Sequence, residues 1–214
     1  MLELLPALPF EFFVAIGTVA FAMSGAFKAV RHDFDVLGLL VLGFATAIGG
    51  GLIRDALLDR IPTAFIDIGP AIYALIGCVI VLIPRWFSKQ SLPGLVGPES
   101  RAFLSLDAIG LAAFTVLGAQ AGVNANLNIF GVIMVAALTG VGGGAIRDVL
   151  AGEVPLILKG DFYATATIIG AIIFFALYQL SFDATLASAV TFTVTLLLRL
   201  LAIVYKWQLP RPKI

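Results

Sequence analysis

Long runs of apolar residues alternate with short polar segments along the whole chain. A helix needs about 20 mostly apolar residues to cross the ~30 Å hydrocarbon core of a bilayer. Runs of this length predict seven membrane-spanning helices, at residues 10–29, 36–58, 68–86, 103–121, 128–150, 161–180 and 184–206. The expected fold is therefore an all-α polytopic membrane protein, in which residues 1–214 form a single membrane domain.

The composition agrees with this pattern and excludes a soluble domain. Apolar residues make up 61% of the chain and charged residues 12%, and the mean hydropathy is +1.09. A soluble domain is nearer one quarter charged, so this chain has too few polar side chains to cover a water-facing surface. Basic and acidic residues balance at 13 each, which leaves no basic field to attract nucleic acid, and we expect no nucleic-acid partner.

The distribution of basic residues between the predicted spans indicates an orientation. Arg60 lies in a loop on one side, whereas the other side carries nine basic residues: Lys28, Arg31, Arg85, Lys89, Arg101, Lys159, Lys206, Arg211 and Lys213. Short loops rich in Lys and Arg stay in the cytoplasm. This predicts a multi-pass protein of the cell inner (plasma) membrane, with the N-terminus outside and the C-terminus cytoplasmic.

The chain contains an internal repeat. A shift of 93 positions aligns residues 15–80 with 108–173 without a gap, and 22 of the 66 aligned positions are identical. The pattern predicts a first three-helix repeat at 10–87 and a second at 103–180. Because three is an odd number of spans, the second copy enters the membrane from the opposite face, as in the inverted repeats of transporters. The seventh helix, 184–206, lies outside the duplication and is expected to serve in packing or oligomer contact.

Both copies contain the motif GGGxxRD, whose glycines are Gly49, Gly50 and Gly51 in the first and Gly142, Gly143 and Gly144 in the second. Each glycine costs a helix about 1 kcal/mol relative to alanine. We expect a kink at each triplet, in the second and fifth spans, with unwound backbone that lines a cavity. The alternative is close packing, because small residues let helix backbones approach each other.

The charged pairs of the two motifs, Arg54–Asp55 and Arg147–Asp148, are candidates for a charged pore lining or gate. A charge at the bilayer centre costs at least ~2.5–3.5 kcal/mol, so such residues are functional candidates by default. Neighbouring residues on a helix do not face each other, and pairing across the two copies is therefore expected. The alternative is an interfacial anchor whose arginine extends to the lipid headgroups.

Other polar residues of the spans have two interpretations. Thr46 and Thr139 precede the triplets by three residues, and they either line the lumen of the path or hydrogen-bond back to their own helix. Lys28 and Arg199 are expected to extend to the membrane surface. Tyr163 has the position of an interfacial aromatic residue.

The sequence lacks the residues that metal binding and catalysis require. Cys78 and His32 are the only cysteine and histidine, which excludes a cysteine-based or histidine-rich metal site. There is no candidate nucleophile–base pair and no nucleotide-binding glycine motif in a strand–turn–helix setting. We therefore expect no metal, no catalytic residue, no cofactor and no enzyme activity.

These features together resemble the prokaryotic branch of the trimeric intracellular cation (TRIC) channel family, whose members also carry the label of a glycine transporter domain. The resemblance rests on seven spans, two inverted repeats and GGGxxRD in both the second and fifth spans. It implies a homotrimer with one ion pathway per protomer, lined by the kinked second and fifth helices and passing monovalent cations, chiefly potassium. It further implies that the two glycine triplets form the kinks and that the two Arg–Asp pairs form the charged lining.

Two functions fit this architecture. The first is a potassium-permeable channel that passes potassium or sodium ions and has membrane lipids as partners. It needs no cofactor, although lipid can bind to it. The second is a secondary transporter for a small zwitterion such as glycine, in which half-helix N-termini would hold the carboxylate. Discrete single-channel currents would distinguish the channel from the saturable, coupled flux of a carrier.

Overall fold

The computed structural model describes residues 7–87, 100–159 and 162–209, and its regular structure there is helical. Lys89, Arg211 and Lys213, which contributed to the predicted orientation, lie outside the described residues, as does the side chain of Arg85. The helices are α1 (Ala7–Arg31), α2 (Val36–Leu57), α3 (Thr63–Ile66), α4 (Gly69–Phe87), α5 (Arg101–Asn124), α6 (Ile129–Leu150), η1 (Leu156–Leu158), α7 (Ala164–Gln179) and α8 (Ala184–Tyr205).

Seven of these helices correspond to the predicted spans, and α3 and η1 are short turns between them. Within the described residues, α1, α2, α5, α6 and α8 are long and apolar enough to cross a membrane. The apolar parts of α4 and α7, Gly69–Ile83 and Ala164–Gln179, are shorter. An all-helical fold is thus confirmed, and five membrane-crossing helices follow from length and composition.

The starts of α2 and α6 show how the repeated sequence produces repeated local structure. Asp35 caps α2 by accepting a hydrogen bond from the amide of Gly38 (2.7 Å), and Asn128 caps α6 through the amide of Gly131 (2.9 Å). These caps satisfy one of the four free amide groups at each helix start. Both cap residues are 93 positions apart, so the two copies begin this helix in the same way.

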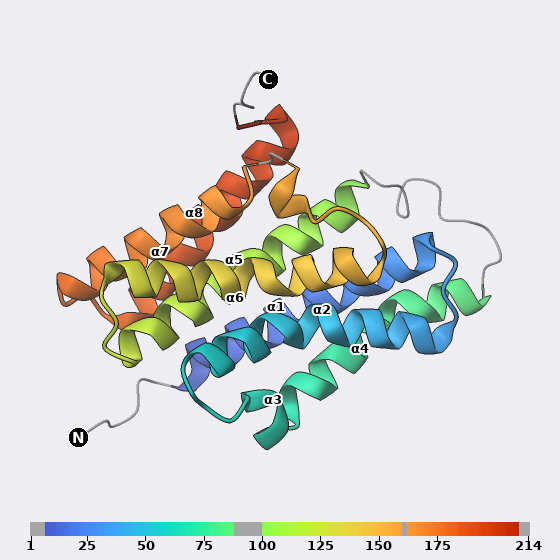
Figure 1. Cartoon of the computed structure of the whole chain (residues 1–214), viewed down its shortest axis with the longest axis horizontal. Coiled ribbons are helices and arrows are strands. Elements are labelled where there is room, and N and C mark those ends of the chain that lie inside the picture. Colours follow the sequence, from blue (N-terminus) through green and yellow to red (C-terminus); the bar gives the residue numbers. More distant parts are fainter. Residues whose placement is uncertain (1–6, 88–99, 160–161, 210–214) are drawn as a thin grey trace.

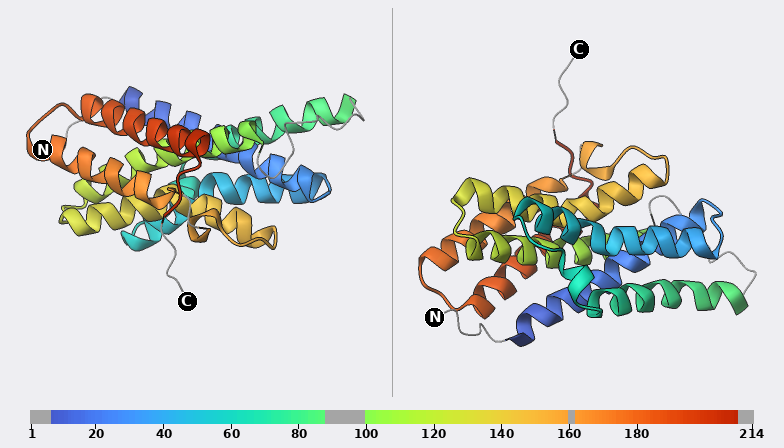
Figure 2. Two further views of the ribbon diagram at one scale, coloured as in Figure 1. Left: turned by 90° about the horizontal axis from the view of Figure 1, so that it is seen from above. Right: turned by 60° about the horizontal axis from the view of Figure 1, so that its bottom comes forward.

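The helices form two groups that meet in the middle of the molecule (Figure 1). In the first group α1 packs against α2 and α4, and in the second α5 packs against α6, α7 and α8. The groups join where α1 contacts α5 and where α2 contacts α6. Figure 2 shows from two further directions that α7 and α8 lie together within the second group. The centre of the protein therefore lies between equivalent helices of the two repeats.

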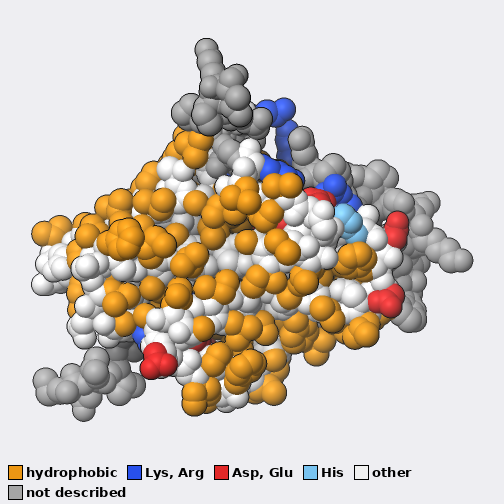
Figure 3. All heavy atoms as spheres, viewed as in Figure 1, with side chains coloured by type: hydrophobic (Ala, Val, Ile, Leu, Met, Phe, Trp, Pro, Cys, Tyr) orange, Lys and Arg blue, Asp and Glu red, His pale blue; other side chains and the backbone are white. Residues whose placement is uncertain are grey.

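Apolar side chains cover much of the outer surface. On the face shown in Figure 3 hydrophobic side chains dominate, and charged side chains lie mainly toward the ends of the molecule. Exposed apolar side chains occur on α2, α4, α6 and α8, among them Leu37, Ile80, Phe130 and Val204. A soluble monomer rarely exposes so large a contiguous apolar surface, whereas lipid tails cover one without penalty.

Candidate functional site

Helices α2 and α6 cross at the glycine triplets. A Cβ atom on Gly50 would collide with the carbonyl oxygen of Thr139, and a Cβ on Gly143 would collide with the carbonyl oxygen of Thr46. The contacts are reciprocal, as an approximate two-fold axis between the repeats requires. Phe21 and Phe114, which are also equivalent positions, stack on each other across the groups with ring centroids 5.2 Å apart.

The first two glycines of each triplet therefore serve close packing, which was the alternative interpretation. Both α2 and α6 remain α-helical through the triplets, so the expectation of unwound backbone is wrong. The physical reason is that an intact helix keeps its amide and carbonyl groups hydrogen-bonded, while the missing side chains let the two backbones touch. A bend that keeps the helical hydrogen bonds stays a prediction.

Thr46 and Thr139 bond back to their own helices. The hydroxyl of Thr46 donates to the carbonyl oxygen of Leu42 (2.6 Å), and that of Thr139 donates to Val135 (2.5 Å). Both threonines are fully buried beside the crossing. Of the two interpretations of these threonines, the structure therefore agrees with hydrogen bonding to their own helix.

The Arg–Asp pairs form within each copy, and the expectation of pairing across copies is wrong. Arg54 donates to Asp55 through Nε (2.7 Å) and Nη2 (2.9 Å), and Arg147 donates through Nε to Asp148 (2.9 Å). The arginine side chain is long enough to curl back to the next residue. All four residues are buried, so the headgroup-anchor alternative also does not describe them.

A loop that follows each motif holds its aspartate in place. The amide of Thr63 donates to Asp55 (2.8 Å), and the amide of Leu156, at the equivalent position, donates to Asp148 (2.9 Å). The carboxylate is thereby oriented toward the arginine of its own helix. We call the surroundings of Arg54–Asp55 the α2 site and those of Arg147–Asp148 the α6 site.

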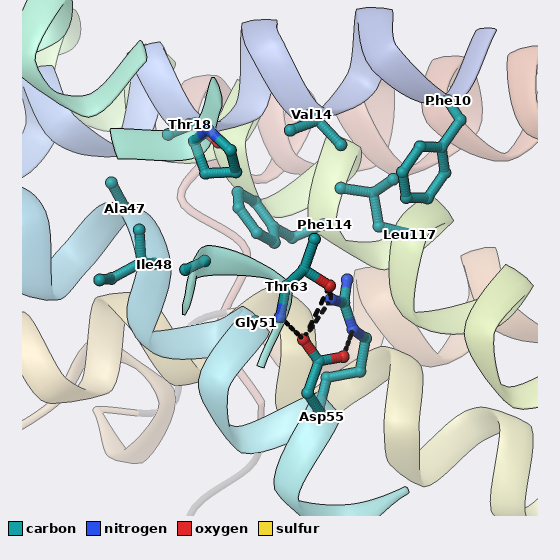
Figure 4. Close-up of a pocket in the computed structure, with 13 residues that line it drawn as sticks. Phe10, Val14, Thr18, Ala47, Ile48, Gly51, Asp55, Thr63, Phe114 and Leu117 are labelled. Carbon is teal, nitrogen blue, oxygen red and sulfur yellow. Dashed lines mark hydrogen bonds and ion pairs between the residues drawn. The ribbon is translucent and has the colours of Figure 1, made fainter. Parts of the chain in front are cut away.

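The α2 site contains a cavity of about 40 Å³. Figure 4 shows Asp55 and Thr63 linked by hydrogen bonds at one side of it, with side chains of α1 and α5 opposite. Gly51 lies on its wall, and a Cβ there would meet nothing nearer than 3.9 Å. The lining also includes Phe10, Val14, Thr18, Arg54, Pro70 and Leu117. At 10–15 Å³ per water, the cavity has room for about three water molecules.

Polar side chains from three helices surround Arg147 in the α6 site. Its Nη1 donates to Asp107 on α5 (2.7 Å) and to Ser24 on α1 (2.6 Å), in addition to the Asp148 bond on α6. The guanidinium also lies over the ring of Phe103, 4.7 Å from its centroid. The Arg147 side chain is 0% exposed, against 9% for Arg54. The two equivalent arginines thus have different environments.

The sequence analysis did not identify Asp107 or Ser24 as partners of Arg147. A signal for Asp107 was present, because an acidic residue within a predicted span is costly unless it is paired. Comparison of the copies would have strengthened it, since the position equivalent to Asp107 in the first copy is the apolar Val14. Nothing in the sequence indicated that Ser24 would face Arg147.

Lys28 does not extend to the membrane surface as expected. It is buried on α1 and donates to Asp148 (3.1 Å) and to Glu153 (2.8 Å), in the loop after α6. A charged amine stays inside a protein only when acidic partners offset its desolvation. These partners belong to the other repeat, so Lys28 ties the two groups together.

Glu153 collects several basic side chains at this end of the molecule. Lys28 and His32 hydrogen-bond to it, the latter at 2.9 Å, and Arg31 and Lys159 lie 3.3 Å and 3.7 Å from its carboxylate oxygens. Partial burial by itself raises the pKa of Glu153. The hydrogen bonds from Lys28 and His32 and the charges of Lys28 and Arg31 outweigh that effect and lower the pKa to about 2.

This shift predicts a loss of stability in acid. A carboxyl group whose pKa is lower in the folded state stabilises the fold above its unfolded pKa of 4.5 and loses this contribution as pH falls toward 2. We expect the melting temperature in detergent to fall over that interval, and to fall less in Glu153→Gln, which has no charge to lose. An equal pH dependence in the variant would contradict the assignment.

Arg199 and Tyr163 also differ from their expected places at the membrane surface. Both are buried, and the guanidinium of Arg199 lies 4.6 Å from the centroid of the Tyr163 ring. Arg199 donates in addition to the carbonyl oxygen of Phe162 (3.2 Å). Because Arg199 belongs to α8, the helix outside the duplication contributes a buried charge next to the α6 site.

The described residues contain no group of three or more histidine, cysteine or acidic side chains that could hold a metal ion. Cys78 is a free, buried thiol on α4.

A family model described as "Glycine transporter" matches this chain twice, at residues 11–86 and 104–179. The two matches are offset by the 93 positions of the internal repeat. Among curated proteins, the inner membrane protein YadS of Escherichia coli is 40% identical over 203 residues, which cover 92% of each chain.

Solved structures give the same result at the level of the fold. A structure described as "Structural basis for conductance through TRIC cation channels" is 44% identical, with a TM-score of 0.81 and coverage of 96% of this chain and 98% of the other. The TRIC orthologue from Rhodobacter sphaeroides is 30% identical, with a TM-score of 0.80 and coverage of 92% and 98%. The chain is therefore a multi-pass membrane protein and belongs to the glycine transporter family, that is, the prokaryotic trimeric intracellular cation channel family.

Proposed function

We propose that the protein is a cation channel that passes potassium through a pathway within each protomer. The cavity of the α2 site is the observation that carries the proposal. It lies between α1, α2 and α5, next to the crossing of α2 and α6, and it is lined by a buried ion pair and an open glycine. The solved relatives, described as cation channels, support the same function.

The pathway runs along α2 and α6 and passes the two Arg–Asp pairs. In the α2 site the positive charge of Arg54 is neutralised by Asp55, so a cation entering the cavity does not meet a net positive wall. Water in the cavity, the Thr63 hydroxyl and carboxylate oxygens then replace part of the hydration shell of the ion. In the α6 site protein side chains occupy this space, and the conformation described is closed there.

The assembly is a homotrimer in the inner membrane, with lipid around it and one path per subunit. One relative is described as a trimeric channel, which supports the assembly. Lys28, Arg31 and Lys159 gather around Glu153 at one end, and Arg60 contacts the carbonyl oxygen of Ala121 elsewhere. By the rule that basic loops stay inside, the Glu153 end is cytoplasmic, with the N-terminus outside and the C-terminus inside.

Recordings in planar bilayers test the proposal. We expect the purified protein to give discrete potassium currents, with a reversal potential in asymmetric KCl that follows the potassium gradient. Gly51→Leu should lower the unitary current several-fold, because the new side chain enters the cavity. Val41→Leu, on the exposed face of the same helix, is the matched control and should leave the current unchanged.

Two outcomes would contradict the channel. The first is the absence of current from folded protein. The second is saturable uptake of glycine coupled to protons or sodium, without discrete current steps, which would support the carrier. No feature of the two sites favours the carrier, since α2 and α6 lack the half-helix N-termini that would hold a carboxylate.

A further inference from the structure

The α2 and α6 sites are equivalent in the repeat but differ in chemistry at three positions. Val14, Pro70 and Leu117 line the cavity of the α2 site. In the internal repeat, the position of Val14 corresponds to Asp107, and that of Pro70 corresponds to Tyr163. The position of Leu117, in the second copy, corresponds to Ser24 in the first. Three apolar residues that border open space thus correspond to three polar residues.

The polar residues occupy the space that the cavity leaves open. Asp107 and Ser24 hold the Nη1 atom of Arg147, as described above. Tyr163 lies over the third glycine of the triplet, and its hydroxyl is 2.9 Å from the position that a Cβ on Gly144 would take. In the α2 site, a Cβ on the equivalent Gly51 would have no atom nearer than 3.9 Å. Tyr163 therefore fills the counterpart of the open part of the cavity.

Packing and charge hold Tyr163 in this place, and its hydroxyl, which lies near Asp107, makes no hydrogen bond of normal geometry within the described residues. Near it, Oδ2 of Asp107 and Nη2 of Arg147 are likewise buried without a partner among the described residues. A buried polar group without a partner is destabilising by about 1–3 kcal/mol. Movement of the ring would break no hydrogen bond of normal geometry and would let water reach all three atoms, which favours opening.

Arg199 opposes this movement. Its guanidinium covers the Tyr163 ring at 4.6 Å, and a cation over an aromatic face in a desolvated setting is an attractive contact. Arg199 is itself fixed by the carbonyl oxygen of Phe162, immediately before the tyrosine. Helix α8, which lies outside the duplication, thus holds the Tyr163 ring in place in the α6 site and has no counterpart in the α2 site.

We propose that Tyr163 is the gating residue of the α6 site, that it closes the part of the pathway equivalent to the open cavity of the α2 site, and that Arg199 holds it closed. This rests on the proposed cation channel. When the ring leaves Gly144, water enters beside Asp107 and Arg147, and the two halves of the path become alike.

Single-channel recording in symmetric KCl tests the gate. Tyr163→Ala should raise the open probability by about tenfold, because it removes the ring. Tyr163→Phe should stay near the wild type, because the ring and its contact with Arg199 remain. Tyr178→Ala makes the same change at an exposed tyrosine of α7, outside the cavity lining, so it is the matched control and should not change the open probability.

Arg199→Met provides an independent variant that leaves the tyrosine in place and should also raise the open probability. Wild-type open probability in both Tyr163→Ala and Arg199→Met would overturn the gate while the channel stands. The same holds if Tyr163→Ala does not fold and Arg199→Met behaves as the wild type. Absence of potassium current from folded wild-type protein would overturn the proposed function, and the gate with it.

Discussion

Asp107→Ala is expected to lower the free energy of unfolding by about 3–5 kcal/mol, the range found when one member of a buried ion pair is removed. Asp107 and Arg147 are both 0% exposed and 2.7 Å apart. Without Asp107, the buried Arg147 would depend on the carboxylate of Asp148 alone, which it shares with Lys28, so its charge would be only partly compensated. Unfolding in mixed micelles with increasing SDS measures the change.

A double variant separates charge from packing in this prediction. Asp107→Val with Arg147→Met replaces both members of this ion pair by apolar side chains, with a valine at the position that is Val14 in the first copy. Replacement of a whole buried ion pair by apolar residues is often neutral, so the double variant should recover most of the lost stability. If it is as unstable as Asp107→Ala alone, the incompletely compensated charge of Arg147 is not the cause.

Gly143→Ala is expected to destabilise the protein by about 1–3 kcal/mol, as overpacking does in well-packed interiors. The added Cβ would overlap the carbonyl oxygen of Thr46 on α2. A backbone carbonyl inside a helix cannot rotate away, so α2 and α6 must separate at their crossing. This loss exceeds the gain of about 1 kcal/mol that alanine brings to a helix.

Gly51→Ala is the matched control, with the opposite sign. It makes the same chemical change at the third position of the other triplet, where the added Cβ has no neighbour within 3.9 Å. Without a steric clash, the higher helix propensity of alanine is the main effect, and a small stabilisation of up to about 1 kcal/mol is expected. Melting temperatures in the same detergent compare the two variants, and we expect a lower value for Gly143→Ala than for Gly51→Ala. Equal effects would show that the crossing does not depend on the absence of a side chain.

The apolar runs and the repeat were readable from the sequence because they depend on local composition and on identity between two segments. The helix starts at Val36 and Ile129 follow from a cap residue and a run of helix-compatible side chains, which neighbours in sequence determine. Membership of the family rests on the motif in two copies and was confirmed by the two matches of the family model.

The local environment of the charged residues was harder to foresee. Lys28 pairs with Glu153 across 125 positions, and Arg147 reaches Ser24 across 123. Such contacts depend on which faces of α1 and α6 turn toward each other. The sequence pattern of an almost uniformly apolar helix gives little information on which face that is. Pairing within each Arg–Asp motif depends in turn on the loop amides of Thr63 and Leu156, which no motif reveals.

A membrane protein of duplicated three-helix units follows from the residue pattern alone, because bilayer thickness and hydropathy act on each segment independently of the others. The packing of the helices against each other adds that the glycine triplets let intact helices touch, and that the α2 site is open while the α6 site is filled. The physical reason is that a missing side chain is compatible with either a break or a close contact, and the neighbouring helix selects between them. The atom nearest to a Cβ on Gly51 is 3.9 Å away, whereas a Cβ on Gly144 would lie 2.9 Å from the Tyr163 hydroxyl.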